Sequence, residues 1–562
     1  MGHITGGGVL LRVLKRCGVR YFFANFGTEY ASMIHDYLET NGEGMPEMII
    51  CPHEATAVSM AHGFGMVSGR PQAAMVHSLP GLANSVGGVI NASSSQVPLI
   101  LVSGLTAFSL KGYKGSRRIR VHWGQESRDQ GGLVRQFVKW DYYVKSLEQI
   151  PEAVVRAYEA AASHPQGPVY LAVPMEWLME EWHGEISHRR PLEASLGGAS
   201  PEFVKQIASR LAESENPLII TKSLGRWREA VELLRRAAEI VGARVRWAVG
   251  DYVNLPNTHP LSAPISIKDA DTILVIEADV PWIPRDEEPR EDAYVVYVGL
   301  DGVRLGYPMW GFGFHVSETC HPEIFLRQLI TELENLSSSS LREKAADRMG
   351  EARDEWGRNW RKRVREVESD LSQGIITKRA ASYILGKTIS RDDIIVNEYC
   401  LDVNYVRFEK PGTFYGEPPS GSLGWGLGAA LGVKLAEPSG RVVAVLGDGS
   451  LLFNNPASGL LVSRWYGIPL MIVVLNDSSW GDVKKAVADY LGDPETMHRR
   501  IPGVDYPEEV EFASMAQALG IEGYRVENPG ELEDTLREAY SRLGEGKAVL
   551  VDVRVAPTPL TT

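Results

Sequence analysis

The sequence lacks any long hydrophobic run. None of its apolar segments approaches the ~20 residues that a membrane-spanning helix requires. The first eight residues contain neither a basic stretch nor an apolar core, so we expect no signal peptide. Both observations predict a protein without membrane association.

Cysteine is scarce. The four cysteines are widely spaced and form no Cys-x-x-Cys pair, which disfavours a disulfide framework or a zinc site. They are Cys17, Cys51, Cys320 and Cys400. We expect reduced, buried thiols in a cytoplasmic protein.

Basic residues are also fewer than acidic residues. The 58 Lys and Arg residues are outnumbered by 71 Asp and Glu, which gives a net charge of −13. Such a chain is a poor candidate for binding nucleic acid or an anionic membrane, because both need clustered cations. The short cluster at 117–120 is interpreted as a solvated loop or subunit contact. The 44% hydrophobic and 23% charged composition is typical of a globular protein.

Strand-like apolar segments alternate with helical patterns along the 562 residues, as in α/β proteins with parallel sheets. We predict three blocks, at 1–185, 200–335 and 371–562. The polar stretch 186–200 is a predicted linker, and the charged segment 341–370 is a predicted solvated helix.

Two strand ends carry oxygen ligands. The apolar run 442–446 leads into Gly-Asp-Gly-Ser at 447–450, and the run 469–475 leads into Asn-Asp-Ser-Ser. Adjacent parallel strands would bring Asp448 and Asp477 together at the carboxyl edge of the sheet, where open α/β sheets bind ligands. Oxygen ligands beside a phosphate suit Mg²⁺ or Ca²⁺.

Residues 447–481 resemble the thiamine-diphosphate motif, in which Gly-Asp-Gly is followed by a pair of asparagines. Asp477 stands where that family has its second asparagine. Across most of its length the chain is similar to the acetolactate synthase, benzoylformate decarboxylase and benzaldehyde lyase group. The resemblance implies three doubly wound parallel-sheet domains, in the order pyrimidine-binding, central and diphosphate-binding.

The resemblance also implies thiamine diphosphate and Mg²⁺ as cofactors. It implies three metal ligands, namely Asp448, Asp477 and the carbonyl of Ser479. Asn476 is an alternative ligand, because Asp477 adds a negative charge beside an anionic cofactor. The implied cofactor-binding residues are Glu54, Leu423, Gly447, Asp448, Gly449, Ser450 and Asp477.

Glu54 follows a predicted strand and begins a predicted helix. Taken alone, it is typical of a first-turn carboxylate that complements the helix dipole. Its setting, His-Glu-x-x-Ala-x-x-x-Ala-x-Gly, resembles the pyrimidine-side motif of the family. The resemblance implies that Glu54 hydrogen-bonds the aminopyrimidine ring and so activates the cofactor.

Four further positions are considered, of which His77, Gln125 and His122 are implied to lie near the substrate. His77 matches a histidine of the benzoylformate decarboxylase branch, and a proton relay is weighed against a purely structural role. Gln125 falls in the place of the family's Gln-Glu loop, with His122 as a weaker candidate. Thr28 lies in a loop where the family's proline is replaced, which leaves its role open.

Two other cofactors are weighed. The segment Gly424-x-Gly426-x-x-Ala429 loosely fits a dinucleotide fingerprint, but Pro418-Pro419 upstream leaves no clean strand before it. In some acetolactate synthases the central domain holds FAD. No glycine-rich flavin segment stands between 217 and 250, so FAD is expected to be absent.

The leading hypothesis is thiamine-diphosphate-dependent decarboxylation of a 2-oxo acid, with carboligation to a second carbonyl compound. The alternatives are a non-oxidative 2-oxo acid decarboxylase and a lyase of 2-hydroxyacyl compounds or 2-hydroxy ketones. Two hypotheses from other functional classes remain open, namely a non-catalytic cofactor-binding subunit and a nicotinamide-dependent dehydrogenase. The resemblance implies a homodimer or homotetramer with active sites between chains, acting on 2-oxo acids or aldehydes.

Overall fold

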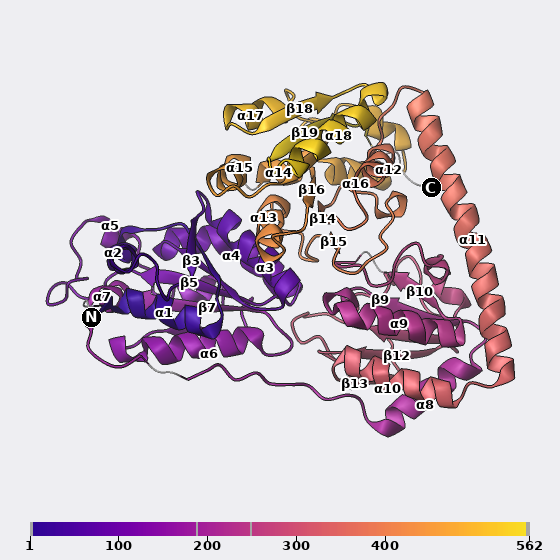
Figure 1. Ribbon diagram of the computed structural model, residues 1–562, viewed down its shortest axis with the longest axis horizontal. Coiled ribbons are helices and arrows are strands. Elements are labelled where there is room, and N and C mark those ends of the chain that lie inside the picture. Colours follow the sequence, from indigo (N-terminus) through magenta and orange to yellow (C-terminus); the bar gives the residue numbers. More distant parts are fainter. Residues whose placement is uncertain (1–3, 187–188, 248–249, 454, 558–562) are drawn as a thin grey trace.

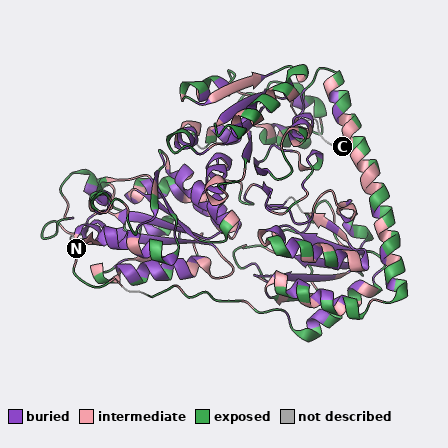
Figure 2. Ribbon diagram, in the orientation of Figure 1, coloured by how far each residue is buried: buried purple, intermediate pink, exposed green. Residues whose placement is uncertain are grey.

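Three parallel sheets organise the computed structural model, which describes residues 4–186, 189–247, 250–453 and 455–557. Figure 1 shows each sheet flanked by helices, and each sheet with its helices is called a unit. The first and third units are in contact through α3 (Glu54–Ser68) and α13 (Gly426–Ala436). The central strands of each sheet are buried, whereas several edge strands and the outer helices are partly exposed (Figure 2). The predicted α/β class with three parallel-sheet units is confirmed.

The first sheet has six parallel strands in the order β3-β2-β4-β5-β7-β6. These strands are β2 (Tyr21–Ala24), β3 (Glu47–Ile50), β4 (Gln72–Val76), β5 (Leu99–Leu105), β6 (Asp141–Tyr143) and β7 (Pro168–Pro174). Its main helices are α1 (Gly6–Cys17), α2 (Ala31–Glu39), α3 (Glu54–Ser68), α4 (Ser78–Ser94) and α6 (Ile150–Ala162). Small elements complete the unit, namely β1 (Ile4–Thr5), β8 (Glu181–Trp182), α5 (Val121–Gly124) and α7 (Met175–Met179).

The second sheet has five parallel strands in the order β10-β9-β11-β12-β13. They are β9 (Pro217–Thr221), β10 (Arg244–Trp247), β11 (Thr272–Ile276), β12 (Tyr294–Gly299) and β13 (Val316–Thr319). Its helices are α8 (Pro201–Glu213), α9 (Arg228–Val241) and α10 (Pro322–Asn335). The described linker residues 189–200 form neither helix nor strand.

The third sheet has six parallel strands in the order β15-β14-β16-β17-β19-β18. They are β14 (Ile394–Glu398), β15 (Phe414–Tyr415), β16 (Val442–Gly447), β17 (Met471–Asn476), β18 (Glu522–Val526) and β19 (Val549–Arg554). Its helices are α12 (Lys378–Thr388), α13 (Gly426–Ala436), α14 (Asp448–Phe453), α15 (Pro456–Trp465), α16 (Gly481–Leu491), α17 (Phe512–Ala518) and α18 (Pro529–Gly544).

The charged segment predicted as a solvated helix is α11 (Ser339–Ser372), which runs along the second and third units (Figures 1 and 2). Ser338 caps its first turn by accepting from the N–H of Leu341. Few of its side chains are buried, so many charged residues stay in water. The boundaries 1–185, 200–335 and 371–562 stay a prediction.

Helices α3 and α13 cross so closely that the backbone of one meets the backbone of the other at two glycines. A Cβ on Gly63 would lie 2.1 Å from the carbonyl oxygen of Ala429, and one on Gly432 would lie 2.0 Å from that of Met60. Glycine is therefore needed at both positions, and the contact fixes the first unit against the third. Within the described residues, no helix is long and apolar enough to cross a membrane. All four cysteines are buried and unpaired.

Candidate functional site

The two oxygen-bearing strand ends meet at the carboxyl edge of the third sheet. Strands β16 and β17 are parallel neighbours, with Gly447 opposite Leu475. Asp448 and Asp477 therefore face one cavity of about 350 Å³. Of the predicted site residues, the cavity brings together Leu423, Gly447, Asp448, Gly449, Ser450, Asp477 and Ser479.

Asp448 is a buried carboxylate with one free oxygen. Its Oδ1 accepts from the N–H of Gly449 at 2.8 Å. Its Oδ2 is fully buried and has no hydrogen-bond partner among the described residues. Burial, together with the charge of Asp477, raises the pKa of Asp448 to about 7. A divalent cation would give this oxygen its missing partner, so the donor set fits Mg²⁺.

Asp477 lies in a tight turn after β17. Its Oδ1 accepts from the N–H and the hydroxyl of Ser479, at 3.2 and 2.9 Å. Asn476, the alternative ligand, turns into the sheet instead. Its Nδ2 donates to Asp552 at 3.0 Å, and it does not line the cavity. The geometry thus favours Asp477 over Asn476 as the residue facing a bound cation.

Lys378 is a cavity residue that the sequence analysis missed. It is the first residue of α12, and its Nζ lies 3.2 Å from Asp477 Oδ2. Burial works against the charged lysine, but the charge of Asp477 outweighs it and the pKa of Lys378 is raised. The only local signal was a lysine directly after a capping threonine, where a cation opposes the helix dipole.

Leu423 reaches the cavity from the loop before α13. Glu398, at the end of β14, holds this loop by accepting from the N–H groups of Gly424 and Gly426, at 2.7 and 2.8 Å. Burial raises the pKa of Glu398 to about 7. Because a carboxylate already binds the amides that a dinucleotide phosphate would need, the loop does not form a phosphate site of that kind.

Aromatic rings close one side of the cavity. The ring of Trp480 contacts those of Phe453 and Tyr506 edge-on, with centroids 5.4 and 5.3 Å apart. Trp480 and Phe453 both line the cavity. Trp480 therefore forms part of the cavity wall.

Glu54 begins α3 in the first unit. Its side chain is only 6% exposed, and its Oε2 accepts from Asn84 Nδ2 at 3.1 Å. A surface carboxylate that merely complements the helix dipole would not be buried against α4. Asn84 is a second residue that the sequence analysis missed.

His77 joins Gln125 to a buried glutamate. His77 Nδ1 lies 2.7 Å from Glu29 Oε2, and its Nε2 lies 2.8 Å from Gln125 Nε2. Ser78 also donates to Glu29, through its N–H and its hydroxyl. The hydrogen bond to Glu29 raises the pKa of His77, against the opposing effect of burial.

The loop that contains Thr28 thus contributes Glu29 to this group. The weaker candidate, His122, is buried, and its Nδ1 accepts from the N–H of Arg118 at 3.4 Å. Burial lowers the pKa of His122.

The described structure holds two separate groups of site residues. The Asp448 cavity is lined only by residues of the third unit, between Lys378 and Val483. The group of Glu54, His77 and Gln125 belongs to the first unit. One chain therefore supplies two partial sites.

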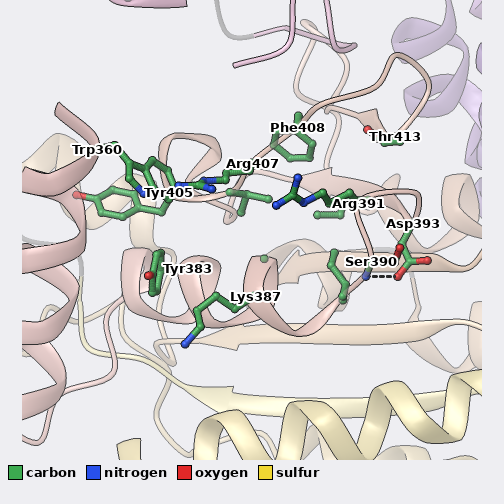
Figure 3. Close-up of a pocket in the computed structure, with 14 residues that line it drawn as sticks. Trp360, Tyr383, Lys387, Ser390, Arg391, Asp393, Tyr405, Arg407, Phe408 and Thr413 are labelled. Carbon is green, nitrogen blue, oxygen red and sulfur yellow. Dashed lines mark hydrogen bonds between the residues drawn. The ribbon is translucent and has the colours of Figure 1, made fainter. Parts of the chain in front are cut away.

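A second cavity, of about 360 Å³, lies beneath the amino end of β14 (Figure 3). Its cations are already engaged. Lys387 lies 3.8 Å from Glu533, Arg391 pairs with Glu409, and Arg407 stacks on Trp360. It lies at the edge of the sheet opposite Asp448, so it is not part of the predicted cofactor site.

The carboxyl edge of the second sheet carries a buried ion pair. Lys222 Nζ lies 2.9 and 3.0 Å from the two oxygens of Asp279, and Tyr307 donates to the same carboxylate. Side chains of the protein itself therefore occupy this edge. The expected absence of FAD stays a prediction.

The three parallel sheets, with a carboxylate-lined cavity at the carboxyl edge of one of them, are those of an α/β protein with a ligand-binding cleft. The structure is similar to benzoylformate decarboxylase from Polynucleobacter necessarius, with a TM-score of 0.77, 22% identity and 99% of each chain covered. It also resembles a putative thiamin diphosphate-dependent enzyme from Mycobacterium smegmatis, with a TM-score of 0.77 and 21% identity over 99% of this chain and 100% of that one. These likenesses establish the three-unit fold.

Two family models identify the family to which the chain belongs. Residues 4–133 match the thiamine pyrophosphate enzyme N-terminal TPP binding domain, and residues 400–553 match the C-terminal TPP binding domain. The chain belongs to the thiamine pyrophosphate enzymes, which confirms thiamine diphosphate as its cofactor.

Two curated relatives span nearly the whole chain. The acetolactate synthase large subunit of Buchnera aphidicola subsp. Acyrthosiphon pisum is 26% identical, covering 99% of this chain and 95% of that protein. The benzoylformate decarboxylase of Pseudomonas aeruginosa is 25% identical, covering 96% and 97%. Two of the three enzyme types in the predicted resemblance are thus represented.

Proposed function

We propose that this enzyme decarboxylates a 2-oxo acid and joins the remaining acyl unit to a second carbonyl compound, an activity of the acetolactate synthase type. One observation carries the proposal. The chain retains a buried Glu54 in the first unit together with a cavity in the third unit that holds a carboxylate oxygen without a partner. Similarity to acetolactate synthase over 99% of the chain supports it.

The residues have distinct roles in this proposal. Asp448, Asp477 and the carbonyl of Ser479 hold Mg²⁺, and Leu423 and Ser450 contact the cofactor. Glu54 hydrogen-bonds the pyrimidine ring, and Asn84 keeps its carboxylate in place. Bound thiamine diphosphate supplies the carbon nucleophile and stabilises the charge left when CO₂ departs. His77 Nε2 accepts a hydrogen bond from the amide nitrogen of Gln125, which positions Nε2 to take up a proton.

A second candidate is a simple decarboxylase, or a lyase of 2-hydroxyacyl compounds or 2-hydroxy ketones. The observation that favours it is the contact between His77 and Glu29. A histidine with a raised pKa is protonated over more of the neutral pH range, so more of the enzyme has a proton available for the product carbon, which would favour protonation over transfer. Similarity to benzoylformate decarboxylase supports this candidate.

The other classes receive less support. A non-catalytic subunit would not need Glu54, His77 and the cation ligands together. A nicotinamide-dependent dehydrogenase would need free backbone amides at 424–426, where Glu398 is bound. A titration that detects NADH binding would revive the dehydrogenase.

We also propose a homodimer as the minimum assembly, with a tetramer as its extension, and a cytoplasmic location without nucleic-acid or membrane partners. Among the described residues, none from the first unit lines the Asp448 cavity. A complete site would therefore form between the first unit of one chain and the third unit of another. Gel filtration that finds an active monomer would contradict this assembly.

The first test uses ¹³C NMR. The protein is mixed with labelled pyruvate, thiamine diphosphate and Mg²⁺, and the products are identified. Acetolactate is the expected product. Acetaldehyde without acetolactate would transfer the assignment to the decarboxylase. Unchanged pyruvate would exclude pyruvate as donor, and labelled benzoylformate and 2-hydroxyacyl compounds would then separate the decarboxylase from the lyase.

The second test asks whether the site is shared between chains. Glu54→Gln and Asp448→Asn chains are inactive alone but are co-expressed with different affinity tags. A dimer containing one of each has one fully native site, so random pairing is expected to restore about a quarter of native activity. No restored activity in the purified mixed dimer would mean that each chain builds its own site.

A further inference from the structure

Lys378 is the only basic side chain among the described residues that line the Asp448 cavity. Three carboxylates line it as well, from Asp448, Asp477 and Asp482. A cavity with this charge would repel an anionic diphosphate. The position of Lys378 therefore matters for how the cavity accepts its cofactor.

The local structure does not favour a lysine at this place. Lys378 is the first residue of α12, directly after the capping Thr377, which accepts from the N–H of Ala380. A cation at a helix N-terminus opposes the helix dipole. Its side chain is also only 22% exposed, so the ammonium has lost part of its water. A nearby carboxylate must offset both effects, and Asp477 is the one within reach.

The numbers of hydrogen-bond donors and acceptors explain why Lys378 and Asp477 occur together. An asparagine, which the family motif has at this position, offers one acceptor oxygen and one NH₂ donor. Asp477 offers two acceptor oxygens and a negative charge. Its Oδ1 is bound by Ser479, and its Oδ2 faces the ammonium of Lys378.

We propose that Lys378 and Asp477 act together in place of a neutral amide, with Lys378 as a positioning residue. The lysine cancels the added charge and holds Oδ2, while Ser479 holds Oδ1, so that the carboxylate keeps a single orientation in the cavity wall. The pair then has the net charge of an asparagine, and the cavity can take Mg²⁺ together with the diphosphate. This inference rests on the cofactor of the proposed function but not on its substrate.

Binding is measured by isothermal titration calorimetry of thiamine diphosphate at fixed Mg²⁺, without substrate. We expect Lys378→Met to weaken binding by about 10-fold to 100-fold, as loss of a partner behind a metal ligand typically does. Asp477→Asn alone should also weaken it, because Lys378 then faces an amide. The double variant Lys378→Met/Asp477→Asn should recover to within about 3-fold of the native affinity, which is the coupling that a double-mutant cycle detects.

The matched control is Lys387→Met, on the same helix but at the opposite edge of the sheet, which should bind like the native protein. Native affinity in Lys378→Met would overturn the proposal. A double variant no tighter than the weaker single variant would also overturn it, because Lys378 would then bind the diphosphate directly. If Lys378→Met does not fold, Lys378→Gln is titrated instead. Failure of the native protein to bind would overturn the cofactor assignment itself, which separates the two failures.

Discussion

His77 Nδ1 lies 2.7 Å from a carboxylate oxygen of Glu29, a residue that is only 3% exposed. The buried glutamate fixes the imidazole so that Nε2 points to Gln125. The N–H and the hydroxyl of Ser78 also donate to Glu29, so the carboxylate is held in place on two sides. The loop after β2 thus controls the proton chemistry of a residue that follows β4.

Glu29→Gln keeps the shape of this contact but removes its charge. The pKa of His77 should fall, so the alkaline limb of the pH–rate profile should move to lower pH. Turnover at neutral pH should fall by about 100-fold if His77 is a general acid. The pH profile is compared with that of Glu126→Gln, a neighbouring exposed glutamate. A profile unchanged in Glu29→Gln would show that Glu29 does not act through His77.

The same pair predicts a pH-dependent stability. The pKa of His77 is raised in the folded state, so the pair stabilises the fold below the unfolded value of about 6.5. This contribution is lost as the pH rises through the folded-state pKa. The difference in Tm between native protein and Glu29→Gln should therefore be larger near pH 6 than near pH 9. Equal differences at both pH values would contradict the assignment.

Glu54→Gln should separate binding from turnover. The amide still fits beside Asn84 but is a poor proton acceptor, so kcat should fall by roughly 10²-fold to 10⁴-fold. Affinity for thiamine diphosphate, measured by calorimetry, should change little. Glu47→Gln, an exposed glutamate in β3, is the control and should keep full activity. Native turnover in Glu54→Gln would remove Glu54 from the mechanism.

The sequence predicted those parts of the site that lie next to each other along the chain or at neighbouring strand ends. Asp448 and Asp477 end two strands whose apolar runs are easy to recognise, so their meeting could be inferred from parallel pairing. Lys378 could not, because it comes from a distant helix and an isolated lysine is typical of a solvated surface. Glu29 was missed for a similar reason, since only the fold turns the loop after β2 towards His77.

The choice between Asn476 and Asp477 also needed the structure. Side chains of a strand alternate between its two faces, so a shift of one residue reverses the direction of each. Asn476 is the last residue of β17 and bonds Asp552 of β19, while Asp477 lies in the turn that follows. The sequence placed both residues at the correct edge but could not orient them.

Asp448→Asn should have opposite effects on the empty and the loaded protein. The native carboxylate is buried beside Asp477 with one oxygen unpaired, so a neutral amide should raise the Tm of the cofactor-free protein by roughly 2–4 °C. The rise in Tm that Mg²⁺ and thiamine diphosphate give the native protein should disappear. Thermal unfolding with EDTA, and then with both ligands, measures the two effects. A variant that is still stabilised by the ligands would remove Asp448 from the metal site.

The contact between α3 and α13 predicts contrasting effects for two helical glycines. Gly63→Ala would place a Cβ 2.1 Å from the carbonyl oxygen of Ala429, and backbone cannot move aside without separating the helices. We expect a loss of about 1–3 kcal/mol or more, with reduced activity because α3 carries Glu54. Gly350→Ala in α11 meets no atom within 4 Å and should stabilise by about 0.5–1 kcal/mol, since alanine favours the helix. Thermal unfolding of both variants measures the two changes in stability. A Gly63→Ala variant as stable as the native protein would show that α3 and α13 pack less closely than the structure indicates.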